Sequence, residues 1–140
     1  MDVYLDASVI VALLTNDALT GRARTFLQSG SLTLFVSDYA AAEVASVIAR
    51  RVRTRDLTEA EARASFDNLD QWTRQFARSV ETAPSDIAMA ASFIRRLDLT
   101  LRAPDAINIA ITRRLGISLA TFDAGMAACA STLGVTVAAA

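Results

Sequence analysis

Apolar and polar residues follow one another along the chain in blocks that predict strands alternating with helices. Short, mostly apolar runs are typical of buried strands and occur at residues 2–5, 32–36, 80–82, 117–122 and 135–137. Apolar residues at helical spacing, with capping residues at their ends, predict helices at residues 7–14, 19–28, 39–53, 59–77, 84–97, 104–114 and 124–133. This order favours a three-layer α/β/α sandwich with a mainly parallel central sheet.

The length and composition of the chain predict one domain, residues 1–140. Hydrophobic residues make up 53% of the sequence, and no Pro/Gly/Ser-rich linker interrupts it. The apolar run at residues 9–14 is far shorter than the roughly 20 residues that cross a bilayer, and no basic leader precedes it. We therefore expect a cytoplasmic protein without membrane contact.

The residue types that are missing exclude much chemistry. Every basic residue is Arg, because the sequence has no Lys and no His, and Cys129 is its single cysteine. Ser-His-Asp and Cys-His systems therefore lack their base, a Walker loop lacks its lysine, and a zinc site lacks its usual ligands. Carboxylates, hydroxyls and Arg remain, and carboxylate oxygens favour Mg²⁺ or Mn²⁺.

Four acids stand where predicted strands end or predicted helices begin. Asp6 and Asp123 directly follow strands, whereas Glu43 and Asp105 lie early in helices, and Asn108 comes one turn after Asp105. Each acid has a simpler explanation: Asp6 and Asp123 as helix N-caps, Glu43 on a solvated face, and Asp105 beside a helix dipole. In a parallel sheet, however, all four would meet at the carboxyl edge, where their mutual repulsion is relieved by a divalent cation.

Four short motifs occur in order along the chain: Asp6 with Ser8, Glu43 within Ala-Ala-Glu-Val-Ala, Pro-Asp-Ala at residues 104–106, and Thr-Phe-Asp at residues 121–123. In this order and spacing they resemble the PIN-domain nucleases over essentially the whole chain. In size the chain is most similar to the VapC-type toxins of bacterial toxin-antitoxin pairs. The resemblance implies a PIN-like fold and a metal-dependent endoribonuclease that uses Mg²⁺ or Mn²⁺.

The resemblance also implies roles for individual residues and partners. The catalytic, metal-binding acids would be Asp6, Glu43, Asp105 and Asp123. Supporting positions around or at the rim of the pocket would be Ser8, Asn108 and Thr121. The expected partners are an RNA substrate, a cognate antitoxin protein, and a second copy of the chain in a homodimer or a toxin-antitoxin hetero-oligomer.

Three questions stay open at this point. Many relatives carry a further Asp two positions after the last acid, where this chain has Gly125, so the number of metal ions is undecided. The net charge of −1 restricts RNA contacts to a local group of arginines, drawn from Arg50, Arg51, Arg53, Arg102 and Arg113. A PIN-fold module that binds RNA or protein without cleaving is the alternative function.

Receiver-type and haloacid-dehalogenase-like domains are disfavoured because both use a lysine.

Overall fold

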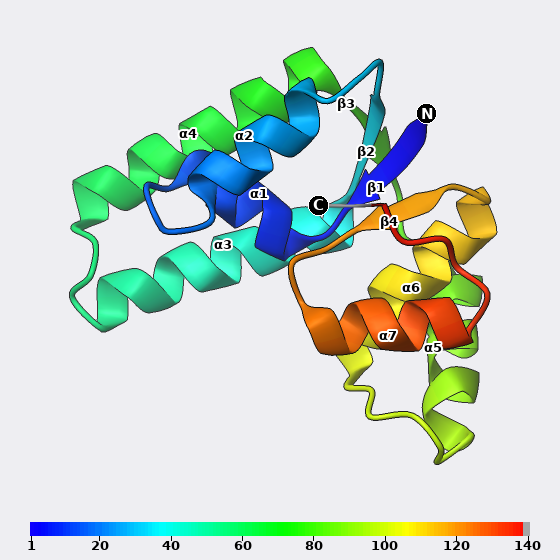
Figure 1. The fold of residues 1–140 in the computed structure, drawn as a ribbon. Helices are drawn as coiled ribbons and strands as arrows, with labels where there is room; N and C mark the ends of the chain where they lie inside the picture. Colours follow the sequence, from blue (N-terminus) through cyan, green and yellow to red (C-terminus); the bar gives the residue numbers. More distant parts are fainter. Residues whose placement is uncertain (139–140) are drawn as a thin grey trace.

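The computed structural model describes residues 1–138, so residues 139–140 of the predicted domain lie outside the described part. The elements follow one another as β1 (Asp2–Leu5), α1 (Ala7–Leu14), α2 (Thr20–Gln28), β2 (Thr33–Ser37), α3 (Asp38–Arg53), α4 (Glu59–Phe76), β3 (Ala77–Val80), α5 (Pro84–Arg95), α6 (Ala103–Leu115), β4 (Ser118–Ala120) and α7 (Ala124–Thr132). Figure 1 shows their arrangement.

A parallel sheet forms the middle layer of the molecule. Among the described residues it has four strands in the order β3-β2-β1-β4, and every neighbouring pair is parallel. In the register of the central strand, Tyr4 lies opposite Phe35 of β2 and Leu119 of β4. Helices α1 to α4 gather on one side of the sheet and α5 to α7 on the other (Figure 1). The predicted α/β/α sandwich with a parallel sheet is confirmed.

Two predicted strands differ from the structure. The third strand is Ala77–Val80 rather than residues 80–82, because α4 ends at Phe76 and the chain enters the sheet without a connecting loop. The predicted strand at residues 135–137 is reduced to one parallel bridge between Leu119 and Val137. Gly134, in a left-handed conformation with φ of 79°, turns the chain just before this bridge.

The core lies on both sides of β1 and along α6. Val3, Tyr4 and Leu5 have no exposed surface, as expected for a central strand covered by helices on both faces. Helix α6 is buried at every position from 106 to 112. Because that stretch includes Asn108, the fold has to supply hydrogen-bond partners for a polar side chain in its interior.

An ion pair between the buried Asp86 and the exposed Arg114 joins α5 to α6. The Asp86 carboxylate, only 1% exposed, accepts hydrogen bonds from Arg114 Nε at 2.8 Å and Nη2 at 3.0 Å. It also accepts one from the Ala83 backbone N–H at 2.8 Å, which caps α5. Burial alone would raise the pKa of Asp86, but these hydrogen bonds outweigh it and hold the pKa below its ordinary value.

We expect Asp86→Asn to lower the free energy of unfolding by about 2 kcal/mol at neutral pH, because Arg114 loses its buried partner. Since the folded pKa of Asp86 is lowered, its contribution is present above the ordinary Asp pKa and is lost as pH falls through the folded value. The difference between wild type and variant should therefore shrink on acidification. Urea unfolding between pH 3 and pH 7 measures it, with the exposed Asp67→Asn as control. A constant difference across this range contradicts the assignment.

Candidate functional site

Asp6 emerges from the carboxyl end of β1 and is almost fully buried, with 5% of its surface exposed. Its Oδ1 accepts hydrogen bonds from the Val9 backbone N–H at 3.2 Å and from Ser8 Oγ at 2.6 Å. Its Oδ2 accepts one from Thr121 Oγ1 at 2.5 Å. Asp6 is thus the N-cap of α1, as its simpler explanation predicted, and also a buried carboxylate at the sheet edge.

The two supporting hydroxyls connect β1 to the segment after β4. Ser8 Oγ donates to Asp6 and accepts from the Phe122 backbone N–H at 2.9 Å. Thr121 Oγ1 likewise accepts from the Asp123 backbone N–H at 3.0 Å. Asp123 then caps α7, its Oδ1 accepting from the Met126 N–H at 3.0 Å. Ser8 and Thr121 therefore link Asp6, the first of the four predicted acids, to Asp123, the last of them.

Glu43 and Asn108 meet between α3 and α6. Asn108 Nδ2 donates to Glu43 Oε1 at 2.6 Å and to the Pro104 carbonyl oxygen at 2.9 Å. Asn108 is 2% exposed and Glu43 is half-buried, so Glu43 does not lie on a fully solvated helix face. Asp105 and Asn108 lie one helical turn apart on α6, and Asn108 is the one of the two that contacts Glu43.

Asp105 lies in the first turn of α6, directly after Pro104. Its Oδ2 is 3.8 Å from Nε of Arg102, whose side chain is 80% exposed. An ion pair this long and this exposed contributes little to stability, at most about 1 kcal/mol. The charge of Arg102 lowers the pKa of Asp105, but burial of the carboxylate outweighs this effect.

Burial and mutual repulsion raise the pKa values of three of the acids. The pKa of Asp6 is raised by burial, although its three hydrogen bonds oppose this. The pKa of Glu43 is raised by burial and further by the charges of Asp6 and Asp105. The pKa of Asp105 is raised by burial, which the charge of Arg102 opposes, and the smaller effect of the Asp123 charge adds to the rise. The four predicted acids therefore form one electrostatically connected row, in the order Asp6, Glu43, Asp105, Asp123.

The row is spread out. Within residues 1–138, no three acidic or cysteine side chains come close enough together to be ligands of one ion. The chemistry of the donor set nonetheless fits a hard divalent cation, because the facing groups are carboxylate oxygens and the arginine paired with Asp105, Arg102, is exposed and 3.8 Å away. Asp6 Oδ2 accepts a single hydrogen bond among the described residues, so a lone pair remains on it. Gly125 borders this row, since a Cβ there would lie 3.3 Å from Asp123 Oδ1.

The candidate arginines lie in different places. Arg102 is beside Asp105, whereas Arg51 lies 3.9 Å from Asp17. Arg50 and Arg53 follow Glu43 on α3 by two and nearly three turns, about 10 and 15 Å along the helix axis.

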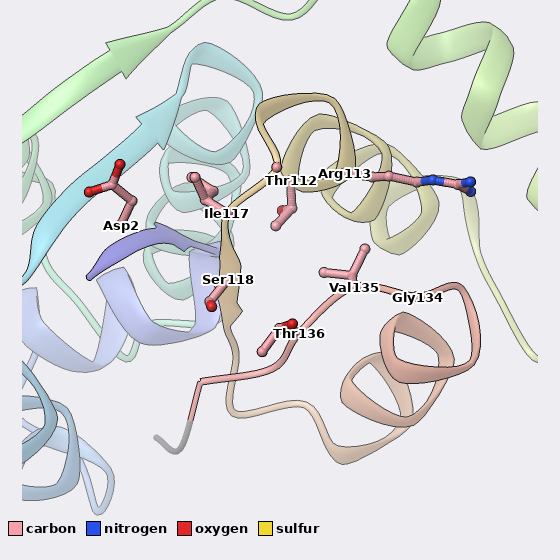
Figure 2. A pocket seen from close by; sticks show the side chains of 9 residues that line it. Asp2, Thr112, Arg113, Ile117, Ser118, Gly134, Val135 and Thr136 are labelled. Carbon is pink, nitrogen blue, oxygen red and sulfur yellow. The ribbon is translucent and has the colours of Figure 1, made fainter.

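Arg113, one of the five candidate arginines, does not lie beside the acidic site. Arg113 lines a cavity of about 350 Å³ together with Asp2, at the edge where β1 and β4 begin (Figure 2). Helix α6 begins near the carboxyl ends of the strands, where Asp105 lies, and ends near their amino ends. Arg113, in its last turn, therefore lies away from Asp105. Its guanidinium instead lies over the Phe93 ring, 5.7 Å from the ring centroid.

Sequence reasoning missed the buried hydroxyl contacts that Tyr4 makes with Ser37 and Asn108. The Tyr4 hydroxyl lies 2.6 Å from Ser37 Oγ and donates to Asn108 Oδ1 at 2.5 Å, all within the buried interior. The apolar run at residues 2–5 had marked Tyr4 as core. The sequence did contain a signal for these contacts. Tyr4 is the one residue in the apolar run 3–5 with a polar group, and a buried hydroxyl needs a hydrogen-bond partner.

The fold and site together define an α/β protein with a parallel sheet and an acidic site at the carboxyl edge of its strands. The PIN-domain family model matches residues 3–131, and the chain belongs to this family. No significant match was found among curated proteins.

Solved structures with the same fold cover nearly the whole chain. VapC20 of Mycobacterium tuberculosis, described as a sarcin-ricin loop cleaving toxin, is 21% identical with a TM-score of 0.75, covering 99% of each chain. FitAcB from Neisseria gonorrhoeae is 20% identical with a TM-score of 0.74, covering 96% of this chain and 95% of that one. VapBC2 from Rickettsia felis, bound to promoter DNA, is 11% identical with a TM-score of 0.73, covering 99% and 98%. At these identities the likeness concerns the fold.

We expect Glu43→Gln to raise the melting temperature of the metal-free protein at pH 7 by about 3 °C. The variant keeps an oxygen for Asn108 to donate to and removes a charge that burial and two neighbouring carboxylates disfavour. Because the folded pKa of Glu43 is raised, the wild type loses stability as pH rises through that pKa, and the difference should vanish at lower pH. Thermal melts in EDTA between pH 4 and pH 8 test this, with the exposed Glu81→Gln as control. A less stable Gln variant at pH 7 contradicts it.

Proposed function

We propose that this chain, as a single PIN-like domain of residues 1–140, is a Mg²⁺- or Mn²⁺-dependent endoribonuclease and the toxin of a toxin-antitoxin pair. The observation that carries the proposal is the connected row of four carboxylates, supplied by four separate segments at one edge of a parallel sheet. Structural acids are usually paired with cations, whereas carboxylates that raise one another's pKa and lie beside only an exposed arginine are typical of a site for a metal ion.

The four acids would hold the ion, and the surrounding residues would hold the acids. When bound, such an ion activates a water molecule and neutralises the charge that develops on a phosphodiester under attack. Ser8 and Thr121 fix the orientation of Asp6 through both carboxylate oxygens, and Asn108 fixes Glu43. Asp105 or Glu43, with raised pKa values, is suited to accept a proton from the attacking water. Arg102 at the rim would bind the phosphate backbone of RNA.

The proposed partners follow from the relatives. The matched structures include FitAB bound to DNA and the VapBC complexes of Rickettsia felis and nontypeable Haemophilus influenzae. By this analogy we assign to the chain a cognate antitoxin, assembly as a homodimer or toxin-antitoxin hetero-oligomer, and a cytoplasmic location. None of the helices in residues 1–138 is long and apolar enough to cross a membrane.

A second candidate is a PIN-fold module that binds RNA or protein without cleaving it. The spread of the carboxylates within the described residues favours this alternative, because no three of them are positioned around a common point. The two candidates differ in one respect that can be measured, since only the nuclease releases new RNA ends in the presence of a divalent metal.

We expect purified protein to cleave single-stranded or structured RNA with Mg²⁺ or Mn²⁺, and EDTA to stop the cleavage. Asp6→Asn should lower the rate roughly 100-fold or more, because the amide has one acceptor oxygen where the carboxylate has two. Gel analysis of end-labelled RNA at saturating metal measures this.

The matched control is Asp2→Asn, at the opposite end of the same strand, which should cleave like the wild type. If Asp6→Asn cleaves normally, the site assignment is wrong. If folded wild-type protein cleaves with neither metal, the binding module replaces the nuclease as our conclusion.

Arg102→Gln should raise KM for RNA about fivefold, which corresponds to about 1 kcal/mol, and reduce the dependence of binding on salt. The reason is the position of Arg102, an exposed cation beside Asp105. Arg113→Gln removes an equal charge at the other edge of the sheet and should leave KM unchanged. Filter binding and cleavage kinetics at several salt concentrations check both. Equal effects of the two variants would indicate binding by overall charge rather than at this rim.

A further inference from the structure

The buried side chains between β1, β2 and α6 form a continuous line of hydrogen bonds that ends on Glu43. It begins at the start of α3, where the Ala40 backbone N–H donates to Ser37 Oγ at 2.9 Å. Ser37 Oγ lies 2.6 Å from the Tyr4 hydroxyl, which in turn contacts Asn108 Oδ1 at 2.5 Å. Asn108 Nδ2 then donates to Glu43 Oε1 at 2.6 Å.

The direction of every bond in this line is fixed by its two ends. Glu43 and the Pro104 carbonyl can only accept, so the Nδ2 group of Asn108 must face them and its Oδ1 must face Tyr4. The single Tyr4 proton therefore goes to Asn108 Oδ1. It follows that the Ser37 hydroxyl donates to the Tyr4 oxygen while its own oxygen accepts from Ala40. All donors point toward Glu43.

Burial makes this line a fixed structure rather than one arrangement among several. Tyr4 has no exposed surface, Ser37 is 1% exposed and Asn108 is 2% exposed, so solvent does not compete for their polar groups. In a chain of bonds with one direction, each bond polarises the next.

We propose that Tyr4 is a positioning residue of the site, which acts through Asn108 to hold the Glu43 carboxylate in the orientation required for metal binding. Without the Tyr4 hydroxyl, Asn108 Oδ1 has no donor, and the amide can rotate away from the geometry in which Nδ2 meets Glu43. The metal-binding part of this inference rests on the proposed function, whereas the hydrogen-bond line does not.

The test compares two substitutions that each remove one buried hydroxyl bonded to Asn108. Tyr4→Phe removes the donor to its side-chain oxygen. Thr112→Val removes a donor to its backbone oxygen, 2.7 Å away, from a residue that is also fully buried. Both keep the shape of the core, so the comparison separates orientation of the amide from general loss of a buried hydrogen bond.

Tyr4→Phe should raise the Kd for Mn²⁺ roughly tenfold and lower kcat 10- to 100-fold, with KM for RNA unchanged, whereas Thr112→Val should change none of these. In a Glu43→Gln background, Tyr4→Phe should change the Mn²⁺ Kd by less than about twofold, because the residue through which it acts is already altered. Wild-type Kd and kcat in Tyr4→Phe, or equal losses in both single variants, would overturn the proposal.

A measurement on the wild type needs neither cleavage nor metal. In ¹⁵N-labelled protein the two Asn108 side-chain amide protons should exchange with solvent far more slowly than those of exposed Asn16, and Tyr4→Phe should abolish the protection. Fast exchange in the wild type overturns the inference, even if Tyr4→Phe fails to fold. Slow exchange in a protein that neither binds Mn²⁺ nor cleaves RNA would refute the proposed function while leaving the positioning of Glu43 by Tyr4 in place.

Discussion

The burial of the Asp6 carboxylate is the constraint on which the rest of the site depends. An ionised carboxylate with 5% exposure costs several kcal/mol unless donors replace the water it loses. Here the donors come from the first turn of α1 and from Thr121 after β4. The bonds that make this burial tolerable therefore also hold the ends of β1 and β4 together, which places Asp123 on the same edge of the sheet.

Asp6 and Asp86 are both buried aspartates, but their hydrogen-bond donors differ and their pKa values shift in opposite directions. Asp86 receives a two-point contact from an arginine, and its pKa is lowered. Asp6 receives only neutral donors, and its pKa is raised. The chain has 14 arginines, so the absence of one on Asp6 is not a shortage of cations. The charge of Asp86 is already neutralised by an arginine, so a metal ion would stabilise it little further. The charge of Asp6 is stabilised only by neutral donors, so a nearby cation would stabilise it more.

The sequence was sufficient to predict the parallel sandwich and the edge of the sheet, at the carboxyl ends of its strands, where Asp6 and Asp123 lie. Asp6 and Asp123 could be placed because each directly follows an apolar run, and the carboxyl ends of parallel strands share one edge. The same local reasoning could not tell which of the candidate arginines lie near the acids, as Arg113 shows. It lies only five residues after Asn108, but α6 is long enough to cross the sheet, and the direction of a helix relative to the sheet is not encoded in its spacing.

The contacts of Tyr4 show a different limit of sequence reasoning. Its partner Asn108 is 104 positions away, and their meeting depends on how α6 packs against β1. Periodicity assigns Tyr4 to the core correctly and says nothing of its hydroxyl.

The contact between Arg102 and Asp105 is one that a bound cation could replace. Arg102 is 80% exposed and 3.8 Å from Asp105, so separating the pair costs little in water. A divalent cation carries twice the charge and contacts oxygen atoms at close to 2 Å, so it would outweigh this contact. The guanidinium would then stand at the rim with its donors available to a phosphate. An exposed arginine beside the acidic row thus suits both states of the site, which a two-point contact such as that of Arg114 with the buried Asp86 would not.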